Sequence, residues 1–321
     1  MKQTYHLGLI GYPVQHSLSP TIHQAALQAL GMSGDYRLFA VEPLPAGEDK
    51  LGEILGQLRA GCLHGLNVTI PHKQTIIPYL DSLSSLAYAI GAVNTVCKWS
   101  DQVIGFNTDA PGFLLDLWKK YPSLWDDENR HALILGAGGA ARAVAFALFA
   151  TGWQVSIAAR RHSQAKTLCQ AMVNHFSQAF RPIQDFEEWS WVRHELSFPW
   201  RDLRGHRMVQ AVGLNELSLS LSPPPRLIVN ATPLGMGPYQ NQSPLPESFD
   251  FPQGTVVYDL VYNPLETILM RQAKDRGAIA LSGIGMLVEQ AALSFELWTR
   301  VSAPREPMYQ AVQSSIQFSK E

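Results

Sequence analysis

Short apolar runs alternate along this chain with longer stretches whose apolar residues recur every three or four positions. The runs Leu7–Ile10 and Asp35–Val41 have the length of β-strands, whereas Asp49–Ala60 has the apolar spacing of an amphipathic helix that ends near Gly61. Strands that alternate with helices in this way indicate βαβ units with parallel neighbouring strands. The pattern therefore predicts an α/β fold for the first part of the chain.

The second half of the chain repeats this alternation with more strongly apolar strands. Residues 131–135, 153–158, 226–230, 255–260 and 279–281 are short, largely apolar runs. Runs of this kind are typical of parallel strands that are buried on both faces. We expect them to form one parallel sheet with helices between the strands.

A glycine-rich turn joins the first of these strands to the helix that follows it. Gly136, Gly138 and Ala141 fit the spacing G-x-G-x-x-G/A. In this motif the first glycine makes the turn, the second lets the backbone approach a pyrophosphate, and the third, small residue lets the helix pack on the strand. The helix N-terminus would offer free N–H groups and the positive end of its dipole to a diphosphate. The turn predicts a dinucleotide site, although such turns also occur in proteins that bind no nucleotide.

Two arginines, Arg160 and Arg161, follow the next strand. They stand about 20 residues after the glycines, where an NAD-preferring site carries an acidic residue for the ribose 2′-hydroxyl. Guanidinium groups suit a 2′-phosphate instead, because they form charge-assisted and often bidentate hydrogen bonds with it. We therefore expect NADP as the cofactor. The alternative is that both arginines belong to an ordinary solvated strand end.

The composition limits the class of protein. A chain of 321 residues is long for one hydrophobic core, so two domains are expected. Its formal net charge of −2 gives no basic surface for nucleic acid, and a small-molecule partner is expected. Cys62, Cys97 and Cys169 form no C-x-x-C pair, which argues against a disulfide framework or a zinc site, and no metal is expected.

The hydrophobic runs are also too short for targeting or membrane segments. The apolar run near the first residues is too brief for a signal peptide. The longest apolar run, 143–150, is far shorter than the roughly 20 residues of a membrane span. We expect a soluble, cytoplasmic protein that does not associate with a membrane.

Polar side chains gather where the strands of the first part end. Asn67 and Thr69 lie two residues apart, Lys73 follows in the first turn of a helix, and Asn94 and Asp109 follow later apolar segments. Open α/β sheets bind ligands at the carboxyl ends of their strands, where such donors and acceptors would suit a polyol. Helix caps and Asx-turns are the structural alternative for Asn and Asp, and the Lys73 ammonium could equally extend into water.

The sequence Ser17-Leu-Ser19-Pro20 predicts the start of a helix. Serine is a good N-cap and proline is favoured at the first helical position, so we expect Ser19 to be the N-cap. Ser17 is then free to face a ligand.

A helix from near Met286 to about Arg300 carries one more candidate. Gln290 shares its apolar face, whereas Glu289 and Glu296 are expected on the solvent side with Arg300. An amide on an apolar face needs a hydrogen-bond partner, which is either a ligand or another buried group.

Eight short blocks together carry a resemblance that no single spacing provides. The blocks are Ser17-x-Ser19-Pro20, Asn67-Val-Thr-Ile-Pro-His-Lys73, Gly91-Ala-Val-Asn-Thr95, Asn107-Thr-Asp109, Gly136-Ala-Gly-Gly-Ala140, Asn230-Ala-Thr-Pro233, Tyr258-Asp-Leu-Val-Tyr262 and Gly283-Ile-Gly-Met-Leu-Val-Glu-Gln290. In this order, over nearly the whole chain, they resemble the bacterial shikimate dehydrogenase family.

The resemblance implies reversible, NADPH-dependent reduction of 3-dehydroshikimate to shikimate, on the pathway to chorismate and the aromatic amino acids. It implies Lys73 and Asp109 as the catalytic pair, with Lys73 as the proton donor in the reduction. The implied substrate ligands are Ser17 and Ser19 for the carboxylate with Tyr262 nearby, and Thr69, Asn94 and Gln290 for ring hydroxyls, together with Asn67. The implied NADP contacts are Gly136, Ala137, Gly138, Gly139, Ala140, Arg160, Arg161, Thr232, Leu260 and Gly283.

The resemblance also implies two α/β domains. Residues 1–110 plus 285–321 would form a substrate-binding and catalytic domain, and residues 111–284 a Rossmann-type, parallel-sheet NADP-binding domain. The sequence leaves open whether two copies form a homodimer.

The chain departs from the family in two places. Arg160 keeps the cation of the cofactor site, but Gln164 stands where many members have a further arginine, which puts the strength of the NADP preference in doubt. The segment 174–225 is longer than the family's usual connection. Its aromatic residues, which include Trp189 and Trp200, are expected to form either a hairpin pad or a partner contact.

Two other functions remain as alternatives. A quinate/shikimate dehydrogenase that uses NAD would be expected to carry threonine in place of Ser19 and an acidic residue in place of Arg160. A non-catalytic NADP-binding sensor would have no need for both Lys73 and Asp109.

Overall fold

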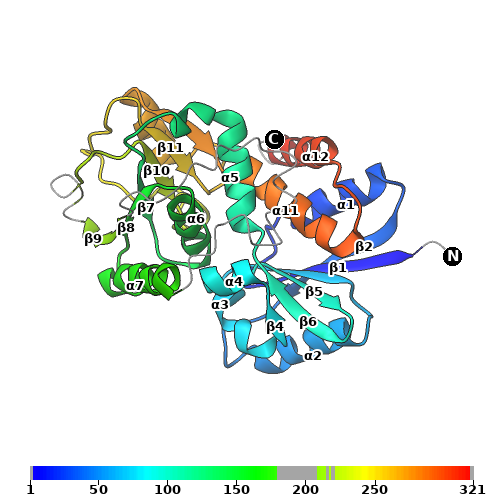
Figure 1. Ribbon diagram of the computed structural model, residues 1–321. Coiled ribbons are helices and arrows are strands. Elements are labelled where there is room, and N and C mark those ends of the chain that lie inside the picture. Colours follow the sequence, from blue (N-terminus) through cyan, green and yellow to red (C-terminus); the bar gives the residue numbers. More distant parts are fainter. Residues whose placement is uncertain (1–2, 179–207, 215–216, 218–220, 319–321) are drawn as a thin grey trace. The chain divides into compact units, whose positions relative to one another are not determined.

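The computed structural model describes residues 3–178, 208–214, 217 and 221–318. The chain forms two compact units, one made of residues 1–112 and 288–321 and the other of residues 113–287. Each unit is built on its own six-stranded sheet (Figure 1). Trp189 and Trp200, expected to belong to a hairpin pad or a partner contact, lie outside the described residues.

The sheet of the first unit contains β1 (Thr4–Gly11), β2 (Ser33–Ala40), β3 (Gly65–Val68), β4 (Ser82–Leu83), β5 (Thr95–Trp99) and β6 (Gln102–Phe106). Its strand order is β2-β1-β3-β5-β6-β4. β1 is parallel to β2 and β3, whereas β5 is antiparallel to both β3 and β6. The sheet is therefore mixed. Asn67 lies in its central strand β3, and Thr69 and Lys73 follow the carboxyl end of that strand.

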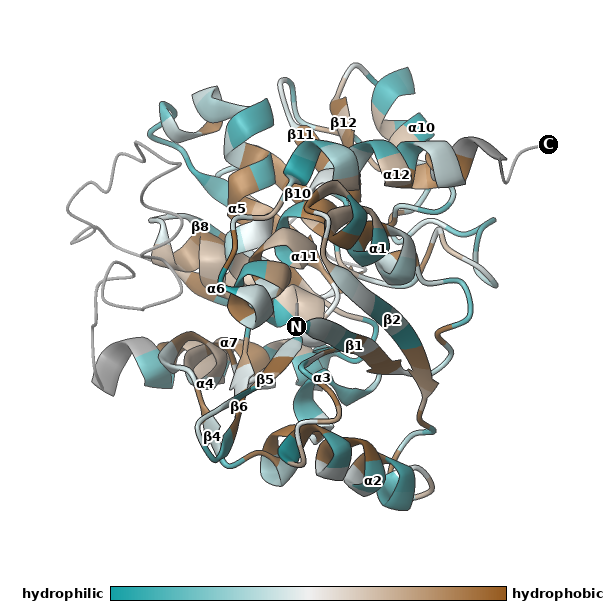
Figure 2. Cartoon of the chain, turned by 90° about the vertical axis from the view of Figure 1, so that its right-hand side faces the viewer, coloured by the Kyte–Doolittle hydropathy of each residue, from teal (hydrophilic) through white to brown (hydrophobic). Residues whose placement is uncertain are grey.

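The first unit also holds α1 (Ser19–Ala29), α2 (Glu48–Arg59), α3 (His72–Thr75), α4 (Ser85–Ile90) and α12 (Arg305–Phe318), while α5 (Asp109–Lys120) and α11 (Ile284–Thr299) each contain residues of both units. α2 buries one stripe, which includes Leu51, Leu55 and Leu58, against the sheet. Its opposite stripe is hydrophilic, as Figure 2 shows. Hydrophobic burial thus fixes this helix on one face of the sheet.

α1 and α11 cover the other face of this sheet. The Trp298 indole on α11 donates a hydrogen bond to the carbonyl oxygen of Val96 on β5, at 3.1 Å. His23 on α1 stacks on Tyr36 of β2, with ring centroids 4.6 Å apart, and also contacts Trp298. Both helices are therefore held against the strands that carry the predicted substrate residues.

The sheet of the second unit contains β7 (His131–Leu135), β8 (Gln154–Ala158), β9 (Val209–Val212), β10 (Leu227–Asn230), β11 (Val256–Asp259) and β12 (Ile279–Ser282). All its ladders are parallel, and the strand order is β12-β11-β10-β7-β8-β9. From β7 the chain adds β8 and β9 on one side and β10, β11 and β12 on the other. This is the doubly wound arrangement of the dinucleotide-binding fold. The α/β fold with a Rossmann-type sheet, predicted from the sequence, is confirmed.

The described helices within the second unit are α6 (Gly139–Ala150), α7 (His162–Gln178) and α10 (Ile268–Asp275). α6 is apolar on nearly every side and buries all of residues 143–150, as expected for a helix enclosed by its own unit. Among the described residues, no helix combines the length and the hydrophobicity that crossing a membrane would require.

Candidate active site

The predicted catalytic pair lies together in the first unit. Lys73, in the short helix α3, donates from Nζ to Oδ2 of Asp109, the first residue of α5, at 2.5 Å. Both side chains are largely buried, with 14% of the lysine and 5% of the aspartate side chain exposed. The Lys73 ammonium, although it belongs to the first turn of a helix, is therefore held by a carboxylate and does not extend into water.

Asn94 ties this pair to Gln290. Its Nδ2 donates to Oδ1 of Asp109 at 2.9 Å and to Oε1 of Gln290 at 3.2 Å. Its Oδ1 accepts the backbone N–H of Thr108 at 2.7 Å. The two oxygens of the Asp109 carboxylate are thus held by different partners, so its rotation is restricted. The structure brings together four of the predicted site residues, Lys73, Asn94, Asp109 and Gln290.

The two serines near α1 contact each other, but the predicted helix cap was wrong by one position. Leu18 is the N-cap, Ser19 is the first helical residue, and no side chain caps the helix in the usual way. The Ser19 backbone N–H instead donates to Oγ of Ser17, which itself donates to Oγ of Ser19, both at 3.2 Å. Ser17 therefore accepts the hydrogen bond from the first free N–H group of the helix, and the hydroxyl groups of Ser17 and Ser19 lie next to each other.

Asn67 has a different environment from the other predicted ligands. Its side chain is buried; its Oδ1 accepts the Tyr36 hydroxyl at 2.8 Å, and its Nδ2 donates to Ser294 Oγ at 3.0 Å and to the carbonyl oxygen of Asn94 at 3.1 Å. Thr69, one residue beyond β3, is half-buried, and its hydroxyl has no hydrogen bond within the described part of the chain. The Thr69 hydroxyl is therefore free for a ligand, whereas the Asn67 amide is occupied by the protein.

The sequence analysis did not predict three buried hydroxyl residues that lie next to the polar side chains of Asn67 and Asn94. Thr95, Thr108 and Ser294 are buried, and Ser294 Oγ lies 2.7 Å from Thr95 Oγ1 and 3.1 Å from Thr108 Oγ1. A signal was present for Ser294, which is a polar residue four positions after Gln290 on an otherwise apolar helix face. The hydroxyl groups form a buried layer that connects β5, the residue before α5, and α11.

The predicted solvent side of α11 was wrong for Glu289 and Glu296, whereas Arg300 is exposed as predicted. Only 10% of the Glu289 side chain and 17% of the Glu296 side chain are exposed, because Arg305 of α12 pairs with both carboxylates at 2.9 Å. An amphipathic pattern identifies a polar face but not whether another helix covers it. Here α12 supplies the cation that makes burial of two acidic residues tolerable.

The glycine turn of the second unit is open toward solvent. Gly136 has φ +115°, and a Cβ atom there would lie 2.9 Å from the carbonyl oxygen of Ala231, so only glycine fits. Gly138 is exposed, and no atom lies within 4 Å of the position of a Cβ atom on it. No side chain caps α6, whose first N–H groups follow this turn. The turn therefore leaves room and hydrogen-bond donors for a diphosphate.

Other predicted cofactor residues lie in the same unit. Arg160 and Arg161 are exposed after β8 and have no ion pair among the described residues, so their charges are available to a phosphate. The Thr232 hydroxyl donates to Oδ1 of Asn230 at 2.7 Å, which orders the loop after β10. A Cβ atom on Gly283 would lie 2.5 Å from the Leu260 carbonyl oxygen, so these two backbones are packed together.

Asp259, the last residue of β11, and Tyr262, three residues after it, have perturbed pKa values. Asp259 is buried, and burial raises its pKa to about 6 even though Thr267, Val261 and Asn230 donate hydrogen bonds to it. Burial also raises the pKa of the Tyr262 phenol, so this side chain is a neutral hydroxyl near neutral pH. Tyr262 can therefore act as a hydrogen-bond donor toward a carboxylate.

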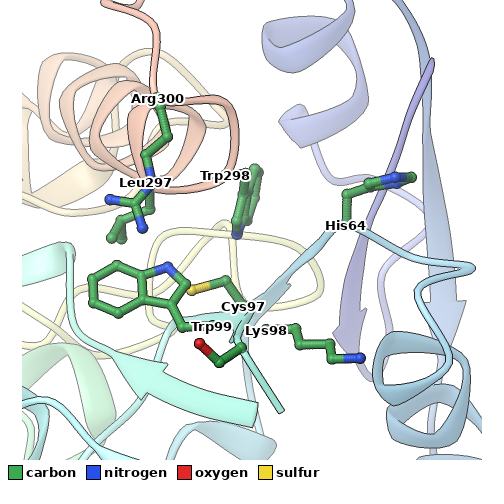
Figure 3. A pocket seen from close by; sticks show the side chains of 8 residues that line it. His64, Cys97, Lys98, Trp99, Leu297, Trp298 and Arg300 are labelled. Atoms are coloured by element: carbon green, nitrogen blue, oxygen red, sulfur yellow. The ribbon is translucent and has the colours of Figure 1, made fainter. Parts of the chain in front are cut away.

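A separate pocket of about 480 Å³ is lined by none of the predicted site residues. Its lining includes residues at the C-terminal ends of β5 and α11 and residues outside them, among which are Lys98, Trp99, Trp298 and Arg300 (Figure 3). The Arg300 guanidinium lies 4.4 Å from the centre of the Trp99 ring, whereas Lys98 points elsewhere and donates to the carbonyl oxygen of Arg59. The two cations do not converge, and we assign no ligand to this pocket.

A dinucleotide-type sheet with an open glycine turn binds a dinucleotide cofactor, and a buried lysine–carboxylate pair suits the proton transfer that accompanies hydride transfer to a carbonyl group. These are features of a dinucleotide-dependent oxidoreductase. The chain falls in that class. Models of known protein families narrow the class further: residues 9–96 match the shikimate dehydrogenase substrate binding domain, and residues 283–313 match the shikimate 5′-dehydrogenase C-terminal domain.

Comparison with individual proteins gives the same result. The chain is 37% identical over 311 residues, 97% of each chain, to a protein of Carboxydothermus hydrogenoformans named shikimate dehydrogenase (NADP(+)). It is 39% identical over 312 residues, 97% of this chain and 95% of the relative, to a protein of the same name from Methanopyrus kandleri. This chain belongs to the shikimate dehydrogenase family.

Solved structures with similar folds include more than one activity. The shikimate 5-dehydrogenase of Thermus thermophilus, in complex with NADP(H) and shikimate, superposes with a TM-score of 0.75 at 35% identity, covering 97% of this chain and 99% of that one. The quinate dehydrogenase of Corynebacterium glutamicum, in complex with NAD, gives a TM-score of 0.78 at 28% identity, covering 97% and 99%. The fold alone therefore does not separate the two activities.

Proposed function

We propose that this protein catalyses the reversible, NADP-dependent reduction of 3-dehydroshikimate to shikimate, a step toward chorismate and the aromatic amino acids. The observation that carries the proposal is the buried Lys73–Asp109 pair, joined through Asn94 to Gln290. These groups offer one proton donor and several hydrogen-bonding groups to a hydroxylated ring.

Lys73 moves the proton in the proposed mechanism. In the reduction its Nζ donates a proton to the carbonyl oxygen as negative charge develops there, and in the oxidation it accepts the proton of the hydroxyl. Asp109 Oδ2 holds Nζ in place, while Asn94 holds the other carboxylate oxygen. The cofactor, when bound, would supply a hydride as NADPH in the reduction and accept one as NADP⁺ in the oxidation.

The other predicted residues bind and orient the substrate. The adjacent hydroxyls of Ser17 and Ser19, with the Tyr262 phenol, are proposed to bind the ring carboxylate. The free hydroxyl of Thr69 and the amides of Asn94 and Gln290 are proposed to bind ring hydroxyls. The amide of Asn94 bonds the proposed site residues Asp109 and Gln290, whereas the amide of Asn67 bonds Tyr36 and Ser294, which are not proposed ligands. We therefore propose that Asn67 supports the site instead of contacting the substrate.

The second unit is proposed to bind NADP. Residues 136–140 would hold the diphosphate, Arg160 and Arg161 the 2′-phosphate, and Thr232, Leu260 and Gly283 the nicotinamide end. The open turn and the two guanidinium groups, which have no ion pair in the described part of the chain, fit such a ligand.

The proposed partners are these small molecules, with no nucleic acid or membrane. We propose that the enzyme acts in the cytoplasm, a location supported by its three free cysteines. A homodimer stays a prediction that sedimentation of the purified protein would test.

A steady-state assay of the purified protein with shikimate and quinate, each with NADP and with NAD, tests the proposal. We expect shikimate with NADP to give the highest kcat/KM. Ser19 and Arg160, at positions where an NAD-dependent quinate enzyme is expected to differ, support this choice. A higher kcat/KM for quinate would overturn the substrate, and a higher value with NAD would overturn the cofactor.

A further inference from the structure

Helices α5 and α11 touch within the first unit at a residue that has no side chain. A Cβ atom on Gly112 would lie 2.7 Å from the backbone nitrogen of Gln290, 2.9 Å from its Cβ and 3.0 Å from its Cα. The first two of these distances are shorter than any ordinary contact between such atoms, and the third is at that limit. Because the opposing atoms are largely backbone, no change of side-chain rotamer could relieve the contact.

This contact lies inside the proposed substrate site. Gly112 is three residues after Asp109 on α5, and Gln290 accepts a hydrogen bond from the same Asn94 amide that binds Asp109. The distance between the two helices at this point therefore sets the distance between a proposed ring-hydroxyl ligand and the proposed catalytic carboxylate.

Ser294 holds the same helices one turn further along α11. Its hydroxyl donates to the carbonyl oxygen of Gln290 at 2.9 Å and lies 3.1 Å from the hydroxyl of Thr108, the residue before α5. It also accepts from Asn67 at 3.0 Å. The close approach at Gly112 is thus accompanied by buried hydrogen bonds that depend on the same spacing.

We propose that Gly112 is a positioning residue for substrate binding, which lets α11 lie close enough to α5 for Gln290 and Asn94 to meet the substrate together. The proposal rests on the proposed function and adds a residue that contacts no substrate. Glycine in a helix is less favourable than alanine, so its presence in the first turn of α5 has a cost that the helix contact explains.

The test is Gly112→Ala, with Gly56→Ala as the matched control. Gly56 is also inside a helix, α2, but no atom lies within 4 Å of the Cβ position there. An added methyl group at residue 112 requires α11 to move by roughly 1 Å to restore ordinary contact. A misplacement of about 1 Å can cost as much as 100-fold in rate.

We expect Gly112→Ala to raise the KM for shikimate, and the shikimate Kd measured by calorimetry, by at least about tenfold. The KM for NADP should stay within about twofold, because the proposed cofactor residues are in the other unit. Gly56→Ala should leave all three constants unchanged. Ser294→Ala, which removes a hydroxyl without adding bulk, should raise the same two shikimate constants by a smaller factor.

Two results would overturn the inference. One is a Gly112→Ala protein with wild-type constants for shikimate; the other is an equal rise in the KM for NADP, which would indicate general damage to the fold. If Gly112→Ala does not fold, unchanged shikimate constants in Ser294→Ala would also overturn it. A wild-type protein without activity on shikimate would instead refute the proposed function.

Discussion

Replacing Lys73 by methionine should separate chemistry from binding. Methionine keeps an unbranched side chain of similar length but removes Nζ, whose hydrogen bond to Asp109 is 2.5 Å long. A positioned proton donor contributes about 10²- to 10⁴-fold to the rate, so kcat should fall by that factor. One hydrogen bond contributes about 0.5–1.5 kcal/mol to binding, so the Kd for shikimate should rise by about tenfold at most.

The double variant Lys73→Met/Asp109→Asn tests whether the two residues act as one unit. Lys73→Met leaves the Asp109 carboxylate, whose side chain is only 5% exposed, without its cation, and Asp109→Asn removes that buried charge. Residues that serve the same proton transfer give effects that do not add. The double variant should therefore have about the same kcat as the slower single variant.

The measurements are steady-state kcat with saturating shikimate and NADP, and calorimetric binding of shikimate to each variant. Lys50→Met, at an exposed lysine on α2, is the control for loss of a positive charge in the same unit. The mechanism is refuted if Lys73→Met keeps more than about a tenth of the wild-type kcat. It is also refuted if the double variant is slower by the product of the two single effects.

Three further predictions concern the cofactor and stability. Arg160→Ser should raise the KM for NADP by about tenfold or more and leave the KM for NAD unchanged in steady-state assays, and an equal rise for both would exclude a role in binding the 2′-phosphate. Burial lowers the pKa of His23 to about 3 from 6.5, so the unfolded state binds a proton below pH 6.5 that the folded state does not, and stability falls as the pH is lowered. Between pH 6.5 and about pH 5 the free energy of unfolding, measured by urea denaturation, should therefore fall by about 2 kcal/mol. The His23→Phe variant should lose this dependence on pH. Arg305→Ala should lower the free energy of unfolding by about 3 kcal/mol because two largely buried carboxylates lose their cation, and suppression of this loss by Glu289→Gln would identify the cause.

Local pattern predicted the elements well. The strand at 131–135, the glycine turn after it and the helix that follows all occur where the sequence placed them. These features depend on a few adjacent residues, since a buried strand must be apolar and a left-handed turn such as that at Gly136 needs glycine. The alternation of strand and helix also predicted that the second sheet is parallel, but it did not predict the order of the strands, and β9 was not among the predicted strands.

Prediction failed where a residue's environment is made by distant segments. Ser19 missed the N-cap position because Ser17 supplies the hydrogen bond to the first helical N–H. Glu289 looked exposed because Arg305, on the next helix, is not visible in the periodicity of α11. Asn67 looked available because its partners, Tyr36 and Ser294, are far away in the chain.

The sequence by itself determined the parallel sheet of the second unit, the dinucleotide turn and the identity of the chemical groups, because backbone geometry and hydrophobic burial act over a few residues. It did not determine that the first sheet is mixed, with β5 antiparallel to both of its neighbours. Only the tertiary structure decided which polar groups have their hydrogen bonds satisfied by the protein and which remain open to a ligand. Lys73 and Asp109 are 36 residues apart, and Asn94 and Gln290 are 196 apart. The contact of Asn94 with Gln290 depends, in our proposal, on helix packing at Gly112, where the fit of two backbones has no signature in the local hydrophobic pattern.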